Sequence, residues 1–181
     1  MARSESLPEI DAALWRELAG AVRDKAHAWR TPVLATCNGD AADARIVVLR
    51  DVDAQGRTLL FFTDARSAKA RQVAAHPAGM LVMWSPSLGW QLRLRVALTL
   101  ETEGLRVASR WARLKLTPAA QDYLSPLAPG STLGSPEPVR DSRGHFGVLA
   151  ARVQSIDWLE LHAQGHRRAL FDAAGSRWIS P

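Results

Sequence analysis

Cations and hydroxyl groups gather in one stretch of this chain, where a strand-like apolar run leads into a helix-like segment. Thr63, Ser67 and Lys69 lie close together after that run, and Arg45 begins the preceding apolar run. Hydroxyl groups, cations and the free backbone N–H groups of a helix N-terminus all favour a phosphate group. The stretch therefore predicts a site for a phosphorylated small molecule.

The composition is that of an ordinary globular protein with a basic charge balance. The chain has 181 residues, 47% of them hydrophobic, and a formal net charge of +5. A chain of this length and apolar content can bury one core, so we expect a single domain over residues 1–181. Its arginines are scattered rather than clustered, which favours a solvated surface with one phosphate site over nucleic-acid binding.

Other classes of site find little support in the sequence. There is no apolar run of membrane-spanning length and no apolar signal core, so we expect a cytoplasmic protein that does not bind membranes. The single cysteine, Cys37, excludes an internal disulfide. His162 and His166 lie on either side of a turn at Gln164-Gly165, and we expect no metal site there. Asp43 and Asp51 do not form a paired-carboxylate site, and no catalytic residue is assigned.

The remaining pattern predicts strands joined by tight turns, with a few peripheral helices. We expect a first helix over about residues 9–30, strands over 32–37, 44–52, 58–63, 79–84, 90–101, 146–161 and 166–171, shorter helices over 66–76 and 105–116, and a loop over 127–140. Strands that follow one another through tight turns pair in the antiparallel sense. The expected fold class is therefore mainly β with peripheral helices, as a small antiparallel barrel over about residues 31–172.

Four motifs in order resemble the flavin-binding signature of the pyridoxamine 5′-phosphate oxidase family. The RIVVLR run (45–50) followed by FFTDARSAK (61–69) is similar to the strand and the strand–helix junction of that signature. Gln91 resembles the flavin-contacting Gln of the family, and Trp158 and Arg168 resemble the Trp and Arg that close its cofactor site. The resemblance covers most of the chain, from about Thr31 to Phe171.

The resemblance implies an FMN-binding split β-barrel that works as a homodimer, with FMN at the subunit interface. The cofactor-binding residues it implies are Arg45, Ile46, Val47, Val48, Phe62, Thr63, Ser67, Lys69, Gln91, Trp158 and Arg168. Arg50 stands where the family has a substrate-contacting Lys. His166 is the one residue left of the family's R-L-H element. The resemblance therefore implies that both bind the substrate.

Departures from the family pattern concern the substrate. The phosphate-gripping R-P-x-x-S-Q-I-G-like segment is absent from residues 111–134, the R-L-H element is reduced to His166, and the Arg expected at position 68 is Ala68. The expected function is an FMN-dependent oxidoreductase of the short, oxidase-like branch, acting on an unidentified small molecule. The alternatives are an authentic pyridoxamine or pyridoxine 5′-phosphate oxidase and a non-catalytic flavin- or tetrapyrrole-binding protein.

Overall fold

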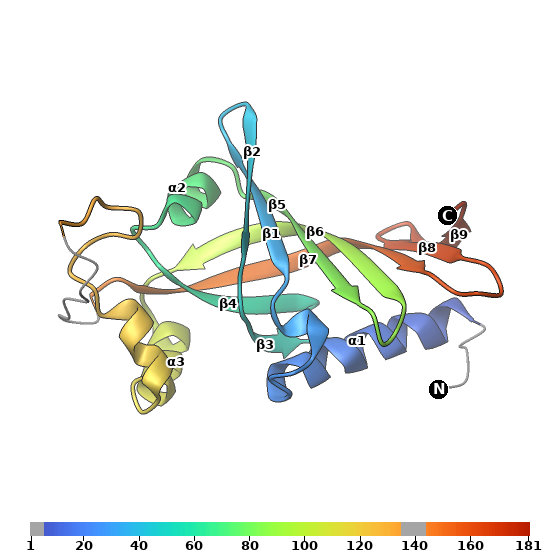
Figure 1. Ribbon diagram of the computed structural model, residues 1–181, viewed down its shortest axis with the longest axis horizontal. Coiled ribbons are helices and arrows are strands. Elements are labelled where there is room, and N and C mark those ends of the chain that lie inside the picture. The colour runs from blue at the N-terminus through green and yellow to red at the C-terminus, as the bar shows by residue number, and fades with distance from the viewer. Residues whose placement is uncertain (1–5, 135–143) are drawn as a thin grey trace.

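One antiparallel sheet dominates the computed structural model, which describes residues 6–134 and 144–181 (Figure 1). The strands are β1 (Val33–Asn38), β2 (Ala41–Ile46), β3 (Leu49–Asp53), β4 (Thr58–Asp64), β5 (Ala78–Ser85), β6 (Trp90–Glu101), β7 (Phe146–Glu160), β8 (Arg167–Asp172) and β9 (Gly175–Ile179). The helices are α1 (Leu7–Arg23), α2 (Ala68–Ala75) and α3 (Leu105–Leu114), with short 3-10 helices over Ala28–Arg30 and Pro118–Tyr123. The predicted antiparallel, mainly β fold is confirmed.

The two longest strands, β6 and β7, form the middle of the sheet. The strand order is β2-β1-β5-β6-β7-β4-β3. In addition, β8 pairs with the C-terminal end of β7, and β9 pairs with β8. Apolar residues alternate along β6 as the sequence predicts, and Leu92, Leu94 and Val96 point into the main core. A second apolar cluster lies under α3, around Trp111 and Phe146.

The first helix is shorter than its apolar pattern predicts. A capping box between Ser6 and Glu9 begins α1, which packs Ile10 and Leu14 into the core with no exposed surface. The helix ends at Arg23 rather than at residue 30, because the backbone is already extended at Asp24. The buried Trp29, which lies within the predicted range of this helix, reaches the core from a separate 3-10 helix.

The predicted strand over residues 44–52 is two strands. β2 pairs with β1 and β3 pairs with β4, so the chain changes its partner strand at Val47 and Val48. The Val47 N–H donates to the Pro32 carbonyl at 3.0 Å, and this bond anchors the crossing. An apolar run over successive residues cannot reveal such a change, because hydrophobicity does not record which strand lies alongside.

The C-terminal end holds one strand more than expected. Residues 146–160 form a single strand, and the sheet continues past residue 172 into β9 through a turn in which Gly175 has a φ of 110°. Part of the predicted 127–140 loop lies outside the described residues, and its described part, 127–134, has no helix or strand. Among the described residues, no helix is long and apolar enough to cross a bilayer.

Candidate functional site

The junction between β4 and α2 brings two hydroxyl groups together at a helix N-terminus. Thr63 is the next-to-last residue of β4 and Ser67 occupies the N-cap position of α2, with 3.2 Å between their hydroxyl oxygens. Both side chains are buried, and the Ser67 hydroxyl makes no capping hydrogen bond to the helix backbone. The first N–H groups of any helix have no partner inside it, so this end of α2 offers donors to an acceptor such as a phosphate oxygen.

Lys69 stands in the first turn of α2 as a half-buried cation. No described carboxylate lies within ion-pair distance of it. Burial lowers the pKa of the Lys69 ammonium, the nearby Arg45 cation lowers it further, and Asp64 acts in the opposite direction. A half-buried ammonium group beside a second cation, with no ion-pair partner of its own in the described part of the chain, fits a bound anion.

Arg45 reaches the same cluster from β2, at the edge of the sheet. Its NH1 group donates to the Thr36 hydroxyl at 2.6 Å and to the Leu34 carbonyl at 3.3 Å. Its NH2 group donates to the Gln72 side-chain oxygen at 2.8 Å and forms an ion pair with Asp43 at 2.6 Å. Four residues from three elements therefore fix this guanidinium group. Sequence reasoning identified Arg45 but missed Thr36 and Gln72.

A second group of predicted residues, Gln91 and Arg168, lies on the face of the sheet opposite to the side chain of Arg45. Gln91 of β6 stands beside Leu159 of β7, and Leu159 stands beside Arg168 of β8. Arg168 forms two hydrogen bonds with Asp157, at 2.9 and 2.7 Å, and this carboxylate raises the pKa of the guanidinium group. The row presents an amide, an apolar side chain and a cation side by side across β6, β7 and β8.

Trp158 does not join this row. It is fully buried and lies in the main core, with its ring 5.4 Å from that of Trp90. Side chains alternate along a strand, so Trp158 and its neighbour Leu159 point to opposite faces. The residue beside Gln91 and Arg168 is therefore Leu159, and a role for Trp158 in cofactor binding stays a prediction. The alternation of more and less buried residues toward the end of β7 is the sequence signal that could have identified Leu159.

The two groups do not meet within one chain. Arg45 is paired with Leu34, which is fully buried, so its side chain lies on the inner face of the sheet. Gln91 precedes the fully buried Leu92 and lies on the outer face. Ile46, the residue after Arg45, also points outward and is 69% exposed.

The other residues of the RIVVLR run follow the change of partner strand. Val47 is 7% exposed and belongs to the main core, while Val48 is half-buried. Phe62 points to the side of β4 away from Thr63, where its ring meets that of Phe146 at 5.1 Å. Phe62 thus packs under α3 rather than beside the two hydroxyl groups.

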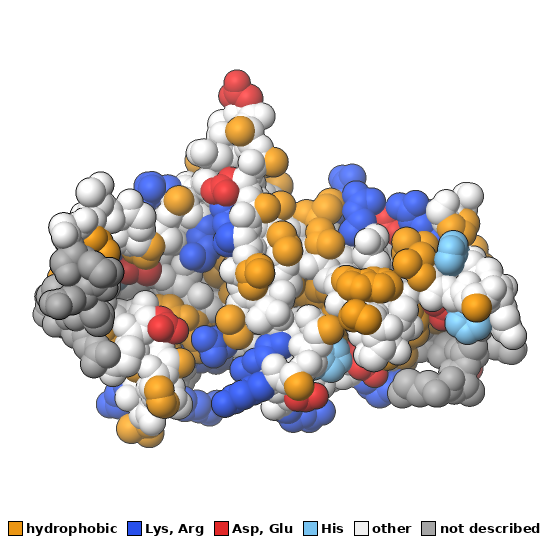
Figure 2. All heavy atoms as spheres, viewed as in Figure 1, with side chains coloured by type: hydrophobic (Ala, Val, Ile, Leu, Met, Phe, Trp, Pro, Cys, Tyr) orange, Lys and Arg blue, Asp and Glu red, His pale blue; other side chains and the backbone are white. Residues whose placement is uncertain are grey.

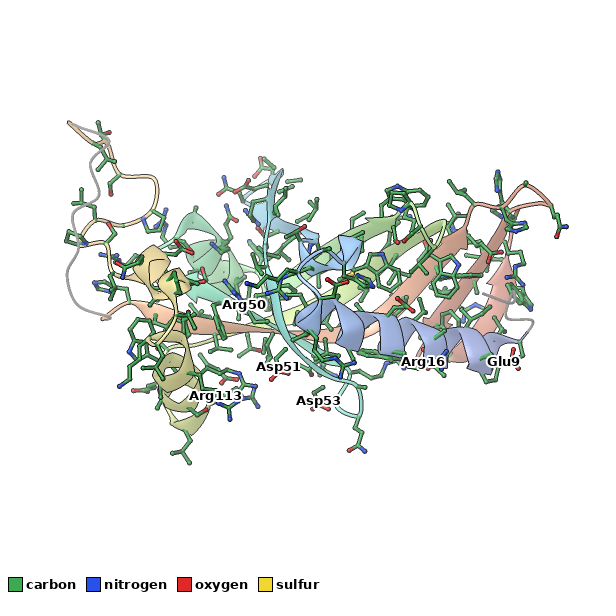
Figure 3. All side chains as sticks on the ribbon, turned by 60° about the horizontal axis from the view of Figure 1, so that its bottom comes forward. Glu9, Arg16, Arg50, Asp51, Asp53 and Arg113 are labelled. Carbon is green, nitrogen blue, oxygen red and sulfur yellow. The ribbon has the colours of Figure 1, made fainter. Side chains whose placement is uncertain are left out.

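Arg50 lies next to Phe62 at the start of β3, where Figure 3 labels it with Asp51. Its guanidinium carbon is 5.5 Å from the centre of the Phe62 ring, and its buried Nε has no hydrogen-bond partner in the described part of the chain. It also contacts Tyr123, whose pKa is raised by burial while Arg50 acts against that rise. Asp51 forms an ion pair with Arg110, which holds β3 against α3.

His166 lies far from Arg50. It precedes β8 at the far end of β7, where its Nδ1 accepts a hydrogen bond from the His162 backbone N–H at 3.2 Å. The neighbours of Arg50 in β3 pair with β4, which in turn pairs with β7 at Leu149 and Ala150, whereas Arg167 pairs with Glu160. About 35 Å of strand therefore separates the two candidates. The structure does not bring the two implied substrate residues together in one chain.

Comparisons with known proteins agree on one family. Residues 12–101, about half of the chain, match the model of the FMN-binding domain of pyridoxamine 5′-phosphate oxidase. A pyridoxine/pyridoxamine 5′-phosphate oxidase of Caulobacter vibrioides is 28% identical over 98% of this chain and 84% of its own length. The enzyme of that name from Thermosynechococcus vestitus is 39% identical, over 51% of this chain and 46% of its own length. The chain therefore matches about half the length of the second relative.

Two solved structures share the fold across their whole length. A pyridoxamine 5′-phosphate oxidase-related, FMN-binding protein from Nostoc punctiforme has a TM-score of 0.72 and 24% identity, over 99% of both chains. PhzG from Burkholderia lata, solved with tetrahydrophenazine-1-carboxylic acid, has a TM-score of 0.76 and 16% identity, over 100% of both chains. The solved structures thus show a split-barrel fold, and the match of the FMN-binding domain shows that the chain belongs to the pyridoxamine 5′-phosphate oxidase family, whose cofactor is FMN.

Proposed function

We propose that two copies of this chain form a cytoplasmic flavoprotein that holds FMN between them and acts as an oxidoreductase on a small molecule. The observation that carries the proposal is the anion-ready cluster of Arg45, Thr63, Ser67 and Lys69. Two adjacent cations without a full counter-charge, beside paired hydroxyl groups at a helix N-terminus, suit the 5′-phosphate of FMN.

Each group of residues has its own task in this proposal. Arg45 and Lys69 neutralise the phosphate, and the hydroxyl groups of Thr63 and Ser67 donate hydrogen bonds to it. The Ile46–Val48 segment lines the ring system, which fits the exposed Ile46 and the half-buried Val48. When bound, FMN supplies the redox chemistry, and the chain supplies binding and orientation.

The row of Gln91, Leu159 and Arg168 forms the second wall. The Gln91 amide can hydrogen-bond the polar edge of the flavin, while Leu159 excludes water and Arg168 lies at the rim, held by Asp157. Phe62 and Trp158 support these walls through packing, since neither points toward the proposed ligand groups.

Two features support a homodimer as the working unit. The phosphate cluster and the Gln91 row lie on opposite faces of one sheet, so a second copy has to supply one of the two walls. The outer face also carries exposed apolar side chains, with Val33 37%, Ile46 69% and Trp84 42% exposed. Figure 2 shows apolar side chains gathered where β1 and β5 lie, as expected for a surface that a partner covers.

The substrate site is proposed to combine Arg50 of one copy with His166 of the other, since the two lie far apart in a single chain. Authentic pyridoxamine 5′-phosphate oxidation is not favoured. Arg66, two residues before Ala68 in the sequence, donates to the backbone carbonyls of Ser125, Pro126 and Leu127 at 2.9, 2.8 and 3.2 Å. Its cation is thereby committed to this segment, and one Arg at position 50 does not neutralise a phosphate dianion.

The visible absorption spectrum of the purified protein tests the proposal. We expect the two flavin bands, in the near-ultraviolet and the blue, and we expect Lys69→Met to lose them while Lys115→Met, on the exposed surface after α3, keeps them. A colourless protein that takes up no FMN at micromolar concentration contradicts the proposal. Release of peroxide with pyridoxamine 5′-phosphate as substrate, by the FMN-loaded protein, would instead identify an authentic oxidase.

A further inference from the structure

A small polar network joins α2 to the edge of the sheet, directly behind the proposed phosphate cluster. The Gln72 side-chain oxygen accepts from the Thr36 hydroxyl at 2.6 Å and from Arg45 NH2 at 2.8 Å. The Gln72 amide nitrogen donates to Asp43 at 2.8 Å. Thr36 and Gln72 are 3% and 7% exposed, so the two sit inside the protein and face the guanidinium group from the buried side.

Gln72 also links the two cations of the cluster. It lies three residues after Lys69, so both side chains project from the same side of α2. Through its side-chain oxygen it holds Arg45, which comes from β2. A single amide therefore fixes the position of one cation relative to the helix that carries the other.

The link through Gln72 counteracts the repulsion between the Arg45 and Lys69 cations. Like charges in a half-buried site repel one another, and an arginine free to rotate would move its guanidinium group away from Lys69 into solvent. The buried acceptors on Gln72 and Thr36 stabilise the conformation in which Arg45 stays beside Lys69 before any anion arrives. Groups held in place in advance lose less conformational entropy on binding, which raises affinity.

We propose that Gln72 is a positioning residue for the phosphate of the cofactor: supported by Thr36, its amide holds Arg45 beside Lys69 so that the chain discriminates a phosphorylated flavin from a flavin without phosphate. This inference rests on the proposed FMN function. In the proposed complex with FMN, Gln72 contacts neither the phosphate nor the flavin ring and acts only through Arg45.

We would titrate the apoprotein with FMN and with riboflavin, which lacks the phosphate. The comparison separates a loss of Arg45 positioning, which affects FMN alone, from a general loss of structure, which affects both ligands. For Gln72→Leu, which keeps the size of the side chain and removes both polar atoms, we expect the affinity for FMN to fall about tenfold. The affinity for riboflavin should change less than about twofold, since Gln72 acts on the phosphate end alone. Flavin fluorescence quenching reports both affinities without any assay of activity.

Two further variants keep the test valid if Gln72→Leu does not fold. Thr36→Val removes the hydroxyl group that bridges Gln72 and Arg45, and it should lower the affinity for FMN but not for riboflavin. The matched control, Thr36→Ser, keeps the hydroxyl group and should keep the preference for FMN.

The outcomes distinguish this inference from the function on which it rests. If the unmodified protein prefers FMN but Gln72→Leu and Thr36→Val keep the same preference, the positioning role is wrong and the phosphate site stands. An equal loss of FMN and riboflavin affinity also overturns the positioning role. If the unmodified protein binds FMN and riboflavin equally, the proposed phosphate site itself is wrong.

Discussion

At the residue scale, the partners of Arg45 differ in how firmly they are held. Thr36 and Gln72 are buried, whereas the Asp43 side chain is 41% exposed. The carboxylate of Asp43 keeps a lowered pKa, through its hydrogen bond with Gln72 and the charge of Arg45, which outweigh the cost of burial. Asp43 therefore carries a negative charge beside Arg45, and its side chain is more exposed than those of Thr36 and Gln72.

This geometry predicts that Asp43 weakens phosphate binding. Asp43→Asn keeps the hydrogen-bonding shape and removes the charge that competes for Arg45, so we expect FMN to bind about threefold to tenfold tighter at low salt. Riboflavin should bind unchanged. Fluorescence titration at two salt concentrations measures both effects, and weaker binding of FMN to Asp43→Asn would show that Asp43 supports the site instead.

At the element scale, the start of α2 is tied to the segment that follows the second 3-10 helix. Asp64 ends β4 and pairs with Arg66 at 2.6 Å, and Arg66 in turn holds three carbonyl groups over residues 125–127. Burial alone would raise the pKa of Asp64, but the hydrogen bonds and charge of Arg66 prevail and lower it below 3.8. The junction and the 125–127 segment are thus stabilised together.

The direction of that pKa shift predicts a pH-dependent stability. A carboxylate whose folded-state pKa is lowered stabilises the fold fully above its unfolded value, and this stabilisation is lost as the pH falls through the folded-state pKa. Asp64→Asn should lower the free energy of unfolding by about 1–3 kcal/mol at pH 7. The difference from the unmodified protein should persist at pH 5 and shrink below pH 3.8.

Urea unfolding across this pH range measures the difference, with Asp40→Asn on the exposed β1–β2 turn as the control. A loss of stability in Asp64→Asn that stays constant from pH 7 to pH 3 would show that the charge of Asp64 does not carry the effect.

The helices and strands also show how much of the fold and of the candidate site can be predicted from the sequence. The alternation in β6 predicted that strand from Trp90 to Glu101, because one face is core and the other is polar. The division of the 44–52 run and the orientation of Trp158 were missed, because both depend on which strand lies alongside. The cations and hydroxyl groups of the site could be identified from their types, but Gln72 and Thr36 become visible only once α2 packs on β1.

At the scale of the whole molecule, the outer face of the sheet is the surface that most needs a partner. Its apolar side chains come from three neighbouring strands, β2, β1 and β5, and Ile46 is the most exposed of Val33, Ile46 and Trp84. The β1–β2 hairpin projects from the body of the protein beside this face (Figure 1). A homodimer that covers the face would also complete the cofactor site.

The dimer predicts an effect of a single charge on this face. Ile46→Glu should convert a dimer into a monomer, because burying an unpaired carboxylate in an apolar interface costs several kcal/mol. Light scattering after size-exclusion chromatography measures the mass. Leu105→Glu is the matched control, since Leu105 is 91% exposed on α3, and it should leave the mass unchanged. A monomeric unmodified protein, or a dimeric Ile46→Glu, contradicts the proposed interface.

Mixing two inactive variants tests the central claim, that one FMN site draws on two copies of the chain. Lys69→Met removes the phosphate end of the site and Gln91→Leu removes the ring end, so each variant alone should bind little FMN. After subunit exchange about half of the dimers are mixed, and each mixed dimer holds one intact site, so about one quarter of all sites should bind FMN again. No recovery of FMN binding in a mixture shown to contain mixed dimers would place both ends of the site in one chain and contradict the account.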